Sequence, residues 1–430
     1  KRILLVTFGC QMNEYDSELI ESILTESGFL FVEDIADADI MLLNTCAVRE
    51  NAERKVFNHA DALRHQLKGK NICIGILGCV ATHLKEKIIE NKKWKIDFIV
   101  GPDSYRRLPE IIKSAIQKKQ KLKEITLSKE ENYADIMPQR HTGDANAWLA
   151  IMRGCDNFCS FCIVPYTRGR ERSRRLDNII RESKKIAQEG FPQITLLGQN
   201  VNSYHDGKYD FTDLLEKISE IKNIKRIRFM SPHPKDFPKK LITLMAQNDK
   251  IAKHIHLPLQ SGNSRILKLM NRGYTKENYL ALVEKLYAQI PSLTFTSDII
   301  VGFPTETEED FLDTVDVIKK ACYAFAFIFK YSPREGTLAA KKYTNDVSEE
   351  IKTKRIVFLN NLQNSISLKV NKSMVGKTFD ILIEKKTTQV QGRTDGNIIT
   401  IIDDARYDVR DLIKVKITQA TSHWLKGEPV

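Results

Sequence analysis

The sequence predicts a multidomain α/β protein with three parts: an N-terminal doubly wound parallel sheet, a central series of six βα units, and a small C-terminal antiparallel β-barrel. Two observations carry this prediction. Short apolar runs alternate with amphipathic stretches over residues 1–120 and again from Trp148 to Lys330, as in βαβ architectures. From Lys377 the hydrophobic period changes to two, which is typical of strands. A length of 430 residues suffices for about three domains.

The N-terminal part, expected over residues 1–120, has buried runs separated mostly by helical patterns such as residues 14–27 and 107–119. That alternation predicts parallel strands with helices on both faces. A Lys-rich polar stretch follows at residues 118–141, so we expect a linker over residues 121–145. The predicted strands are residues 3–8, 29–32, 40–43, 72–77 and 98–100.

The central part, expected over residues 146–345, builds either an open sheet or a partial barrel, and in both cases ligands bind at the carboxyl ends of the strands. A helical pattern at residues 346–368 predicts a connecting helix. In the C-terminal part, residues 369–430, the string Asp395-Gly396-Asn397 indicates a hairpin. The predicted central strands are residues 149–152, 193–197, 226–230, 254–257, 293–301 and 324–330, and the C-terminal ones 379–383, 389–393, 398–402 and 412–417.

Composition restricts the environment and the partners. The chain has 42% hydrophobic and 28% charged residues, which is ordinary for a globular protein and excludes bulk disorder. The longest apolar run, residues 321–329, is half the roughly 18 residues of a membrane span, and no signal peptide precedes Ile3. We therefore expect a soluble cytoplasmic protein without a membrane partner. A formal charge of +12 suits a nucleic-acid partner, although many enzymes are moderately basic.

Three cysteines, Cys155, Cys159 and Cys162, lie at spacings of four and three, just after a predicted strand. Eight cysteines in the chain are too few for a disulfide scaffold, and clustered thiols in a cytosolic protein bind metal or do chemistry. Three thiolates can hold three irons of a cubane cluster and leave the fourth iron open to a substrate. The alternative is a structural zinc site completed by a distant ligand such as His141.

Three further cysteines, Cys10, Cys46 and Cys79, each follow a predicted strand of the N-terminal sheet. Since the carboxyl ends of parallel strands meet at one edge, these thiols are expected to be neighbours and to form a second three-thiol site. The alternative is that they are buried free cysteines, which are common. We interpret the remaining two, Cys73 and Cys322, as small core residues.

The cysteine motifs resemble those of a known family. The spacing of Cys155, Cys159 and Cys162 resembles the signature of radical S-adenosylmethionine (SAM) enzymes. The string RGCDNFCSFCIVPYTRGR, together with GCQMN at Cys10, NTCAVR at Cys46 and Gly78 before Cys79, resembles the methylthiotransferase branch. Residues 44–56, NTCAVRENAERKV, are most similar to the subgroup that modifies isopentenylated adenosine in tRNA. The C-terminal barrel resembles the TRAM module, an RNA-binding β-barrel.

The resemblance implies a partial TIM-like (βα)6 barrel that carries two [4Fe–4S] clusters, one on each cysteine set. It implies transfer of a methylthio group to carbon 2 of N6-dimethylallyladenosine at position 37 of tRNA. Two SAM molecules serve, one as methyl donor and one as source of a 5′-deoxyadenosyl radical, while the auxiliary cluster supplies sulfur. The implied partners are a tRNA anticodon stem-loop, an external electron donor and proteins that supply sulfur or clusters. We expect a monomer.

Polar residues at the ends of the central strands are the candidate SAM contacts, because strand-end residues of such barrels are usually functional. The Gly-Gly-Glu motif of the wider superfamily is absent after residue 197, so Gln199 is a candidate to hold the SAM amino group. Phe161 either stacks on the SAM adenine or anchors its loop to the core. His256 is either a ligand or a core histidine. The candidates are Phe161, Gln199, Asn200, Ser231, His256, Gln260, Ser297 and Asp298.

Five arginines beside the first cysteine set are candidate RNA contacts, because guanidinium groups bind phosphates and stack on bases. The alternative is a structural set of salt bridges with Glu171 and Asp177. The five are Arg168, Arg170, Arg172, Arg174 and Arg175.

Three classes of function compete. The first is a tRNA methylthiotransferase, acting on isopentenylated or, as in close relatives, on threonylcarbamoyl-adenosine. The second is a methylthiotransferase acting on an aspartate of a ribosomal protein. The third is a non-catalytic RNA-binding or electron-transfer protein whose clusters fold it or carry electrons.

Overall fold

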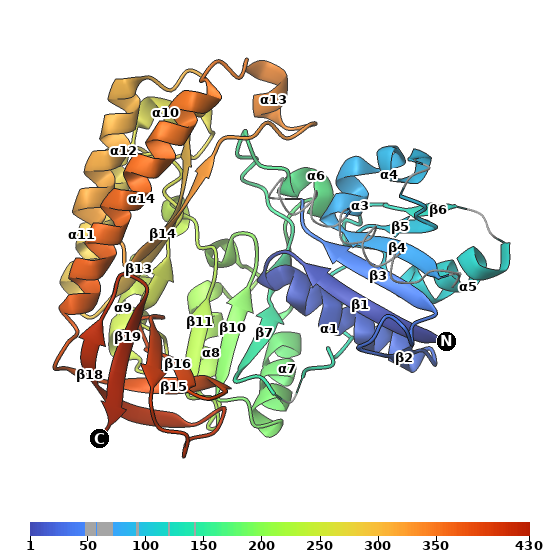
Figure 1. The fold of residues 1–430 in the computed structure, drawn as a ribbon, viewed down its shortest axis with the longest axis horizontal. Helices are drawn as coiled ribbons and strands as arrows, with labels where there is room; N and C mark the ends of the chain where they lie inside the picture. Colours follow the sequence, from blue (N-terminus) through green and yellow to red (C-terminus); the bar gives the residue numbers. More distant parts are fainter. Residues whose placement is uncertain (48–56, 58–71, 92–93, 119–120, 142) are drawn as a thin grey trace.

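The structure is a computed structural model, and it describes all residues except 48–56, 58–71, 92–93, 119–120 and 142. Three parts follow one another along the chain (Figure 1): an N-terminal α/β domain, a central half-open barrel, and a C-terminal β-barrel beneath it. Within the described part, no helix is both long and apolar enough to cross a membrane.

Six parallel strands form the N-terminal sheet, in the order β2-β1-β3-β4-β5-β6. Alternate residues of β3 enter two cores, with Ile40 and Leu42 in one and Met41 and Leu43 in the other. Both faces are therefore covered, which confirms the doubly wound sheet. The strands are β1 (Arg2–Phe8), β2 (Leu30–Phe31), β3 (Ile40–Thr45), β4 (Cys73–Gly78), β5 (Phe98–Val100) and β6 (Leu122–Glu124). The described helices are α1 (Gln11–Glu26), α3 (Cys79–Leu84), α4 (Glu86–Glu90), the short 3-10 turn η1 (Tyr105–Arg107) and α5 (Leu108–Lys118).

The stretch expected to be a linker contributes to this domain. Its first residues form β6, which pairs in parallel with β5. Farther on, Tyr133 is fully buried in the same core as Tyr105, and its hydroxyl donates to the Pro102 carbonyl at 2.9 Å. The sequence concealed this because β6 is a polar edge strand of three residues, with no apolar run to mark it.

The central domain is a partial barrel of six parallel strands, as expected. Two three-stranded sheets, β11-β10-β7 and β12-β13-β14, are joined by a bridge between Ile227 and Ile251. Helices cover the outside (Figure 1) and share one core with the strands. The strands are β7 (Asn146–Ala150), β10 (Gln193–Leu197), β11 (Arg226–Phe229), β12 (His254–His256), β13 (Thr294–Val301) and β14 (Phe325–Lys330). The covering helices are α7 (Leu176–Gln188), α8 (Phe211–Ser219), α9 (Lys239–Gln247), α11 (Lys276–Gln289) and α12 (Glu308–Ala321).

Short elements decorate the carboxyl ends of these strands and the loops between them. They are β8 (Met152–Arg153), α6 (Val164–Arg168), β9 (Arg172–Ser173), η2 (Val201–Ser203), η3 (Pro234–Asp236), α10 (Ser264–Leu269) and α13 (Leu338–Lys342). The prediction that Cys322 is a core residue is wrong: it is exposed, because it ends α12 in the left-handed conformation. Cys73 packs at the edge of an N-terminal core, half-buried.

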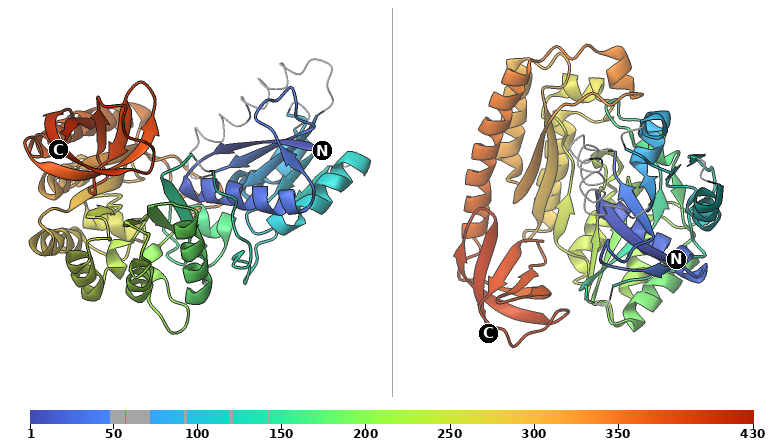
Figure 2. Two further views of the ribbon diagram at one scale, coloured as in Figure 1. Left: turned by 90° about the horizontal axis from the view of Figure 1, so that it is seen from below. Right: turned by 45° about the vertical axis from the view of Figure 1, so that its right-hand side comes forward.

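A long helix, α14 (Glu349–Lys372), connects the two C-terminal parts. It runs along α12 and β14 and leads into the C-terminal barrel (Figure 2). That barrel is closed in the order β15-β16-β17-β19-β18. Its pairs are antiparallel, as expected, except β17 with β19, which is parallel. The strands are β15 (Thr378–Lys386), β16 (Val390–Arg393), β17 (Ile399–Ile402), β18 (Leu412–Ala420) and β19 (Trp424–Pro429).

The hairpin between β16 and β17 docks on the amino-terminal end of the half-open barrel. Buried Arg228 donates to the carbonyls of Thr394 and Asp395 at 2.7 and 2.9 Å. Its neighbour Arg226 donates to the Arg393 and Asp380 carbonyls at 3.1 and 3.0 Å. Burial lowers the pKa of Arg228 to about 9, with the charge of Arg226 adding to the effect. The two domains are thus tied by charged donors whose loss would leave buried carbonyls without partners.

We predict that Arg228→Ala lowers the free energy of unfolding by roughly 1–3 kcal/mol, because each buried acceptor left without a donor pays its desolvation cost. Urea unfolding followed by circular dichroism measures the change. The control is Lys222→Ala, at an exposed position of the loop that precedes β11, expected within about 0.5 kcal/mol of the unsubstituted protein. Equal midpoints for the two variants would contradict the docking role.

Candidate active site

The three N-terminal cysteines meet at the carboxyl edge of the first sheet. Cys10 follows β1 and precedes the first residue of α1, Cys46 directly follows β3, and Cys79 begins α3 directly after β4. Cys46 and Cys79 are buried, whereas Cys10 is exposed at the rim. The parallel strands therefore place at one sheet edge three thiols that lie 36 and 33 positions apart in the sequence, as expected.

Two glycines allow the loops of this edge to approach so closely. Gly9 lies against Cys46: a Cβ on Gly9 would stand 2.6 Å from the Cβ of Cys46. Gly78 has φ +85°, and a Cβ there would stand 2.6 Å from the Thr45 carbonyl. Buried Asn44 then ties β3 to α1, because its amide donates to the Asn13 carbonyl at 2.9 Å. Larger residues at either glycine would push the cysteine loops apart.

The thiols of this set interact with one another. A hydrogen bond from Cys46 and the charge of Arg168 lower the pKa of Cys10 to about 6. For Cys79, burial raises the pKa, and the negative charge of Cys10 adds to the rise. Arg168 opposes it and donates from Nε to the Cys79 Sγ at 3.2 Å. This edge thus combines three thiols with one buried cation.

The second cysteine set lies on one loop between β8 and α6. Cys155 and Cys159 are buried and Cys162 is half-buried. The loop turns on itself, with the Cys162 amide donating to the Cys159 carbonyl at 2.9 Å. Burial raises the pKa of Cys155 to about 11 and also raises that of Cys162, to which the charge of Cys159 contributes.

A segment after α10 clamps this loop. The Ser160 amide and hydroxyl donate to the Met270 and Leu269 carbonyls at 2.9 and 2.8 Å. Buried Arg272 donates from Nη1 to the Cys159 Sγ at 3.3 Å. The loop is therefore held by backbone contacts and by an arginine that touches one of its thiols.

The donor chemistry of both sites fits an iron–sulfur cluster. The thiols stand close enough for one to raise the pKa of another, and metal coordination removes the proton that this crowding retains. In addition, the Arg168 Nη1 donor is buried with no hydrogen-bond partner among the described residues, while the Nε of the same guanidinium group contacts the Cys79 Sγ. Cubane ligands bind different irons and need not converge on one point.

The zinc alternative named His141 as a distant ligand. In the described part of the chain, no group of three or more His, Cys, Asp or Glu side chains, the two cysteine sets included, is arranged to hold a single metal ion. His141 faces Glu21 instead, with Nε2 and Oε2 3.8 Å apart.

The loops after β10 and β11 carry unsatisfied polar atoms that match an amino acid. Gln199 Oε1 and Asn200 Oδ1 are buried acceptors with no partner among the described residues, and His233 Nε2 is also unpaired. The His233 Nδ1 accepts from the Lys235 amide at 3.3 Å, so its Nε2 carries the proton and is a donor. Burial lowers the pKa of His233 to about 2 and keeps the ring neutral. Two acceptors and one donor suit the ammonium and carboxylate groups of SAM.

Ser297, Asp298 and His256, also predicted to contact SAM, differ in the side of the barrel wall that they face. The prediction that Ser297 contacts SAM is wrong. Its side chain is fully buried toward the helices, where the hydroxyl donates to the Leu257 carbonyl and accepts from the Leu259 amide. Successive strand residues face opposite sides, so its neighbour Asp298 faces the barrel interior. There the Asp298 carboxylate lies 3.3 Å from the His256 Nε2.

The last three candidates are held by the backbone or by packing. Ser231 and Gln260 have φ values of +58° and +67°, and the Gln260 carbonyl accepts from the Ile300 amide at 2.8 Å. Phe161 is half-buried and packs on the cluster that contains Ile266 and Met270, the contacts that a loop anchor makes.

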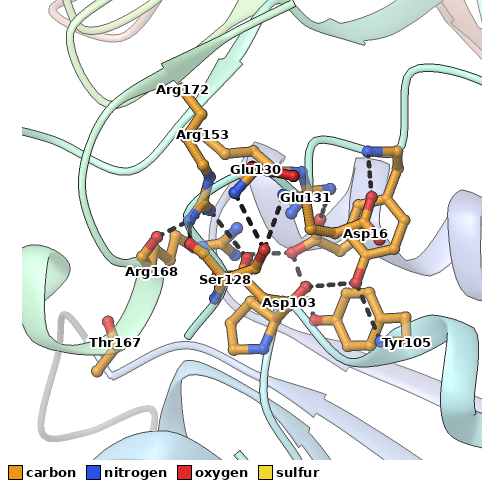
Figure 3. Close-up of polar contacts among 12 residues, drawn as sticks. Asp16, Asp103, Tyr105, Ser128, Glu130, Glu131, Arg153, Thr167, Arg168 and Arg172 are labelled. Carbon is orange, nitrogen blue, oxygen red and sulfur yellow. Dashed lines mark hydrogen bonds and ion pairs between the residues drawn. The ribbon is translucent and has the colours of Figure 1, made fainter. Parts of the chain in front are cut away.

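The prediction that all five arginines contact RNA is wrong for three of them, because Arg168, Arg172 and Arg174 are buried in ion pairs. Figure 3 shows two of these pairs, with Arg168 on Asp16 at 2.8 Å and Arg172 on Asp103 at 2.9 Å. The alternative predicted salt bridges with Glu171 and Asp177, but the three buried arginines pair with Asp16, Asp103 and Glu182. The sequence does not distinguish arginines that pair with nearby carboxylates from arginines that pair with carboxylates of another domain.

The third of these arginines, Arg174, pairs with Glu182 at 2.7 Å. The other two, Arg170 and Arg175, are exposed. Arg170 lies over the Phe158 ring at 5.1 Å and pairs with Asp156 at 2.7 Å. These two remain candidates for RNA contact.

No sequence motif marks the residue on which several of these contacts converge. Asp16 on α1 is fully buried and accepts from Arg153 at 2.6 Å as well as from Arg168 (Figure 3). The sequence does not single it out, because α1 buries other polar residues as well, among them Asn13 and Glu18. No sequence motif indicates Arg272 either. The second half of the motif at residues 44–56 lies outside the described residues.

Family models match three segments of the chain: the Radical SAM superfamily over residues 149–318, Uncharacterized protein family UPF0004 over residues 2–101, and the TRAM domain over residues 372–430. Among similar curated proteins, the tRNA-2-methylthio-N(6)-dimethylallyladenosine synthase of Phocaeicola vulgatus is 42% identical over 100% of this chain and 96% of its own length. The chain belongs to the radical SAM methylthiotransferase family.

A second curated relative and one solved structure are also similar to this chain. The enzyme of the same description from Chloroherpeton thalassium is 44% identical over 99% of this chain and 95% of its length. Among solved structures, the radical SAM methyltransferase TsrM from Kitasatospora setae has a TM-score of 0.59 and 14% identity, covering 79% of this chain and 74% of its own. At that identity the likeness concerns the fold alone.

Glu18, a buried carboxylate on the same helix as Asp16, makes the stability of the protein depend on pH. Burial raises the pKa of Glu18 to about 8, although Arg140 opposes the rise, and its Oε2 has no hydrogen-bond partner. Because the folded state holds the proton more tightly than the unfolded state, the contribution of Glu18 is full below pH 4.5 and is lost as the pH rises through 8.

We predict that Glu18→Gln gains stability relative to the unsubstituted protein as the pH rises from about 4.5 to 8. The limit is about 1.4 kcal/mol for each unit of pKa change. Urea unfolding at several pH values measures it. Glu26→Gln, at an exposed position of the same helix, should show a flat difference, and a flat difference for Glu18→Gln would contradict the assignment.

Proposed function

We propose that the chain transfers a methylthio group to carbon 2 of N6-dimethylallyladenosine at position 37 of tRNA. The observation that carries this is full-length identity of 42–44% to enzymes of that description. Two three-thiol sites, one on each α/β domain, support it, because this reaction needs both a radical source and a sulfur source.

The cysteines and strand-end residues have distinct roles in this proposal. Cys155, Cys159 and Cys162 hold the radical cluster, and Cys10, Cys46 and Cys79 hold the auxiliary one. When bound, the clusters and two SAM molecules supply the electron, the radical, the methyl group and the sulfur. Gln199 and Asn200 accept from the SAM ammonium group through oxygens that have no hydrogen-bond partner among the described residues.

The interior of the half-open barrel receives the base. Asp298 and His256, 3.3 Å apart, present an acceptor and a polar ring there. The base must leave the anticodon-loop stack, at a cost of a few kcal/mol, and an open barrel edge admits it without moving a strand. The tRNA contacts the C-terminal barrel, because the TRAM domain model matches that part of the chain. It also lies beside Arg170 and Arg175.

The remaining assignments follow from this reaction. An external protein supplies electrons, and sulfur- or cluster-supplying proteins renew the auxiliary site. The enzyme acts as a monomer in the cytoplasm, where its tRNA is found. The working units are the N-terminal domain with the auxiliary cluster, to which residues 121–145 contribute β6 and Tyr133, residues 146–345 with the radical cluster, and the C-terminal barrel as the RNA-binding unit, which α14 connects to the rest.

The decisive experiment is anaerobic incubation of the reconstituted protein with SAM, a reductant and one of three anticodon stem-loops, followed by nucleoside mass analysis. The stem-loops carry adenosine, N6-dimethylallyladenosine or N6-threonylcarbamoyladenosine at position 37. We expect the methylthio product from the dimethylallyl substrate alone. Reaction only with the threonylcarbamoyl substrate, or only with a ribosomal-protein aspartate, would replace the proposed substrate.

Iron content tests the assignment of the thiols. The reconstituted protein should contain about eight irons per chain, as expected for two cubanes. Replacing Cys155, Cys159 and Cys162 together by Ala should leave about four, and so should replacing Cys10, Cys46 and Cys79. Each variant should lose product formation. Cys322→Ala is the matched control, because that thiol is exposed and belongs to neither set, and it should keep all eight irons.

The exposed arginines are tested by binding. We predict that Arg170→Ala with Arg175→Ala weakens tRNA binding and reduces the slope of log K against log salt by about 1 for each phosphate that is no longer bound. Fluorescence anisotropy at several salt concentrations measures both. The control combines Lys113→Ala and Lys354→Ala, which remove two exposed charges on helices α5 and α14. An unchanged slope in the arginine variant would retire these residues as RNA contacts.

A further inference from the structure

A single carboxylate connects the two cysteine sites. The Asp16 Oδ1 accepts from Arg153, which lies two residues before Cys155, at 2.6 Å. Its Oδ2 accepts from the Arg168 Nη2 at 2.8 Å, and Arg168 in turn donates to the Cys79 Sγ at 3.2 Å. One carboxylate of the N-terminal domain therefore orients two guanidinium groups of the central domain, of which Arg168 contacts the Cys79 thiol and Arg153 lies two residues before Cys155 in the sequence.

The surroundings leave these groups little freedom. Asp16 is 0% exposed, Arg153 1% and Arg168 3%. The Arg153 guanidinium also lies over the Tyr133 ring at 4.7 Å, and the Tyr105 hydroxyl lies 3.5 Å from Asp16 Oδ2. An uncompensated charge is costly at such depth, so the pairing with Asp16 holds each arginine in position.

At the second cysteine set, Arg272 occupies a position like that of Arg168 at the first. Arg272 donates to the Cys159 Sγ at 3.3 Å and is held by the Pro258 carbonyl at 3.0 Å and the Tyr274 hydroxyl at 3.1 Å. Each cysteine set thus has one thiol that accepts a hydrogen bond from a buried arginine. In neither case does the sequence place the arginine within the cysteine motif it serves.

Hydrogen bonds to cluster sulfurs and nearby positive charge are among the factors that set the reduction potential of an iron–sulfur cluster. Both favour the reduced state, since it carries one more negative charge. We propose that Arg168 and Arg272 are tuning residues that raise the potentials of the auxiliary and radical clusters respectively, with Asp16 as the positioning residue that aims Arg168 at Cys79. This rests on the proposed function only in assuming that both sites bind clusters.

A purely structural role for these arginines makes a different prediction. A structural ion pair affects stability and cluster loading at both sites alike. A tuning role affects the potential of the one cluster whose thiol the arginine touches. The two arginines are therefore matched controls for each other.

The test is an anaerobic redox titration of the fully loaded protein, followed by electron paramagnetic resonance without tRNA. The triple-alanine variants of each cysteine set identify the two signals. We expect Arg168→Met to shift the auxiliary cluster to a more negative potential and to leave the radical cluster unchanged, and Arg272→Met to do the reverse. Arg168→Lys, which keeps the charge, should shift the auxiliary potential less than Arg168→Met. Equal shifts at both clusters, or no shift in either Met variant, would overturn the proposal.

The unsubstituted protein provides a measurement that does not depend on the variants folding. In protein labelled with ¹⁵N-arginine, each reduced cluster should show hyperfine coupling to ¹⁵N. Absence of the coupling at both clusters would overturn the proposal. Asp16→Asn should weaken the coupling at the auxiliary cluster and preserve it at the radical cluster, because Arg272 does not contact Asp16. Coupling without methylthiolation of any tRNA would instead overturn the proposed function and leave this inference standing.

Discussion

The structure depends on the buried pairing of Asp16 with Arg153 and Arg168. These three residues come from two domains, and each lies within a few positions of a cysteine or touches one. A buried ion pair contributes little net stability, but removing one partner is strongly destabilising. The pairing therefore permits one arrangement of the N-terminal sheet on the barrel and penalises others, and the distance between the two thiol sites follows from it. An apolar contact of Met12 and Tyr15 with Ala150 and Leu197 completes the same interface.

The C-terminal barrel is attached by a similar principle at the opposite end of the central domain. Arg226 and Arg228 stand on a central strand and donate to carbonyls of the β16–β17 hairpin. The long helix α14 reaches from the top of the half-open barrel to this module (Figure 2). The C-terminal barrel thus leaves the carboxyl ends of the strands clear, whereas the N-terminal domain packs against the ends of β7 and β10 through Met12 and Tyr15. The second thiol loop and the candidate SAM contacts lie at this carboxyl end.

Much of the fold could be predicted because periodicity is a local property. The runs at Ile40 and Ile194 are buried on both sides, and burial on both sides is what a parallel strand requires. The proximity of Cys10, Cys46 and Cys79 followed from the same reasoning, since each comes directly after such a run. Strand β6 and Tyr133 escaped it, because one is polar and the other takes its place in the core from a loop.

The sequence by itself determined the order of the domains, the two cysteine sets and the family. Spacing and period are encoded within a few neighbouring residues, so no distant contact is needed to read them. Only the tertiary structure decided what the arginines do. Arg168, Arg170, Arg172 and Arg174 are nearly contiguous, yet three of them are buried on carboxylates 8 to 152 positions away, while Arg170 is exposed. The role of a charged side chain depends on the partner that folding brings to it, and no local pattern records that partner.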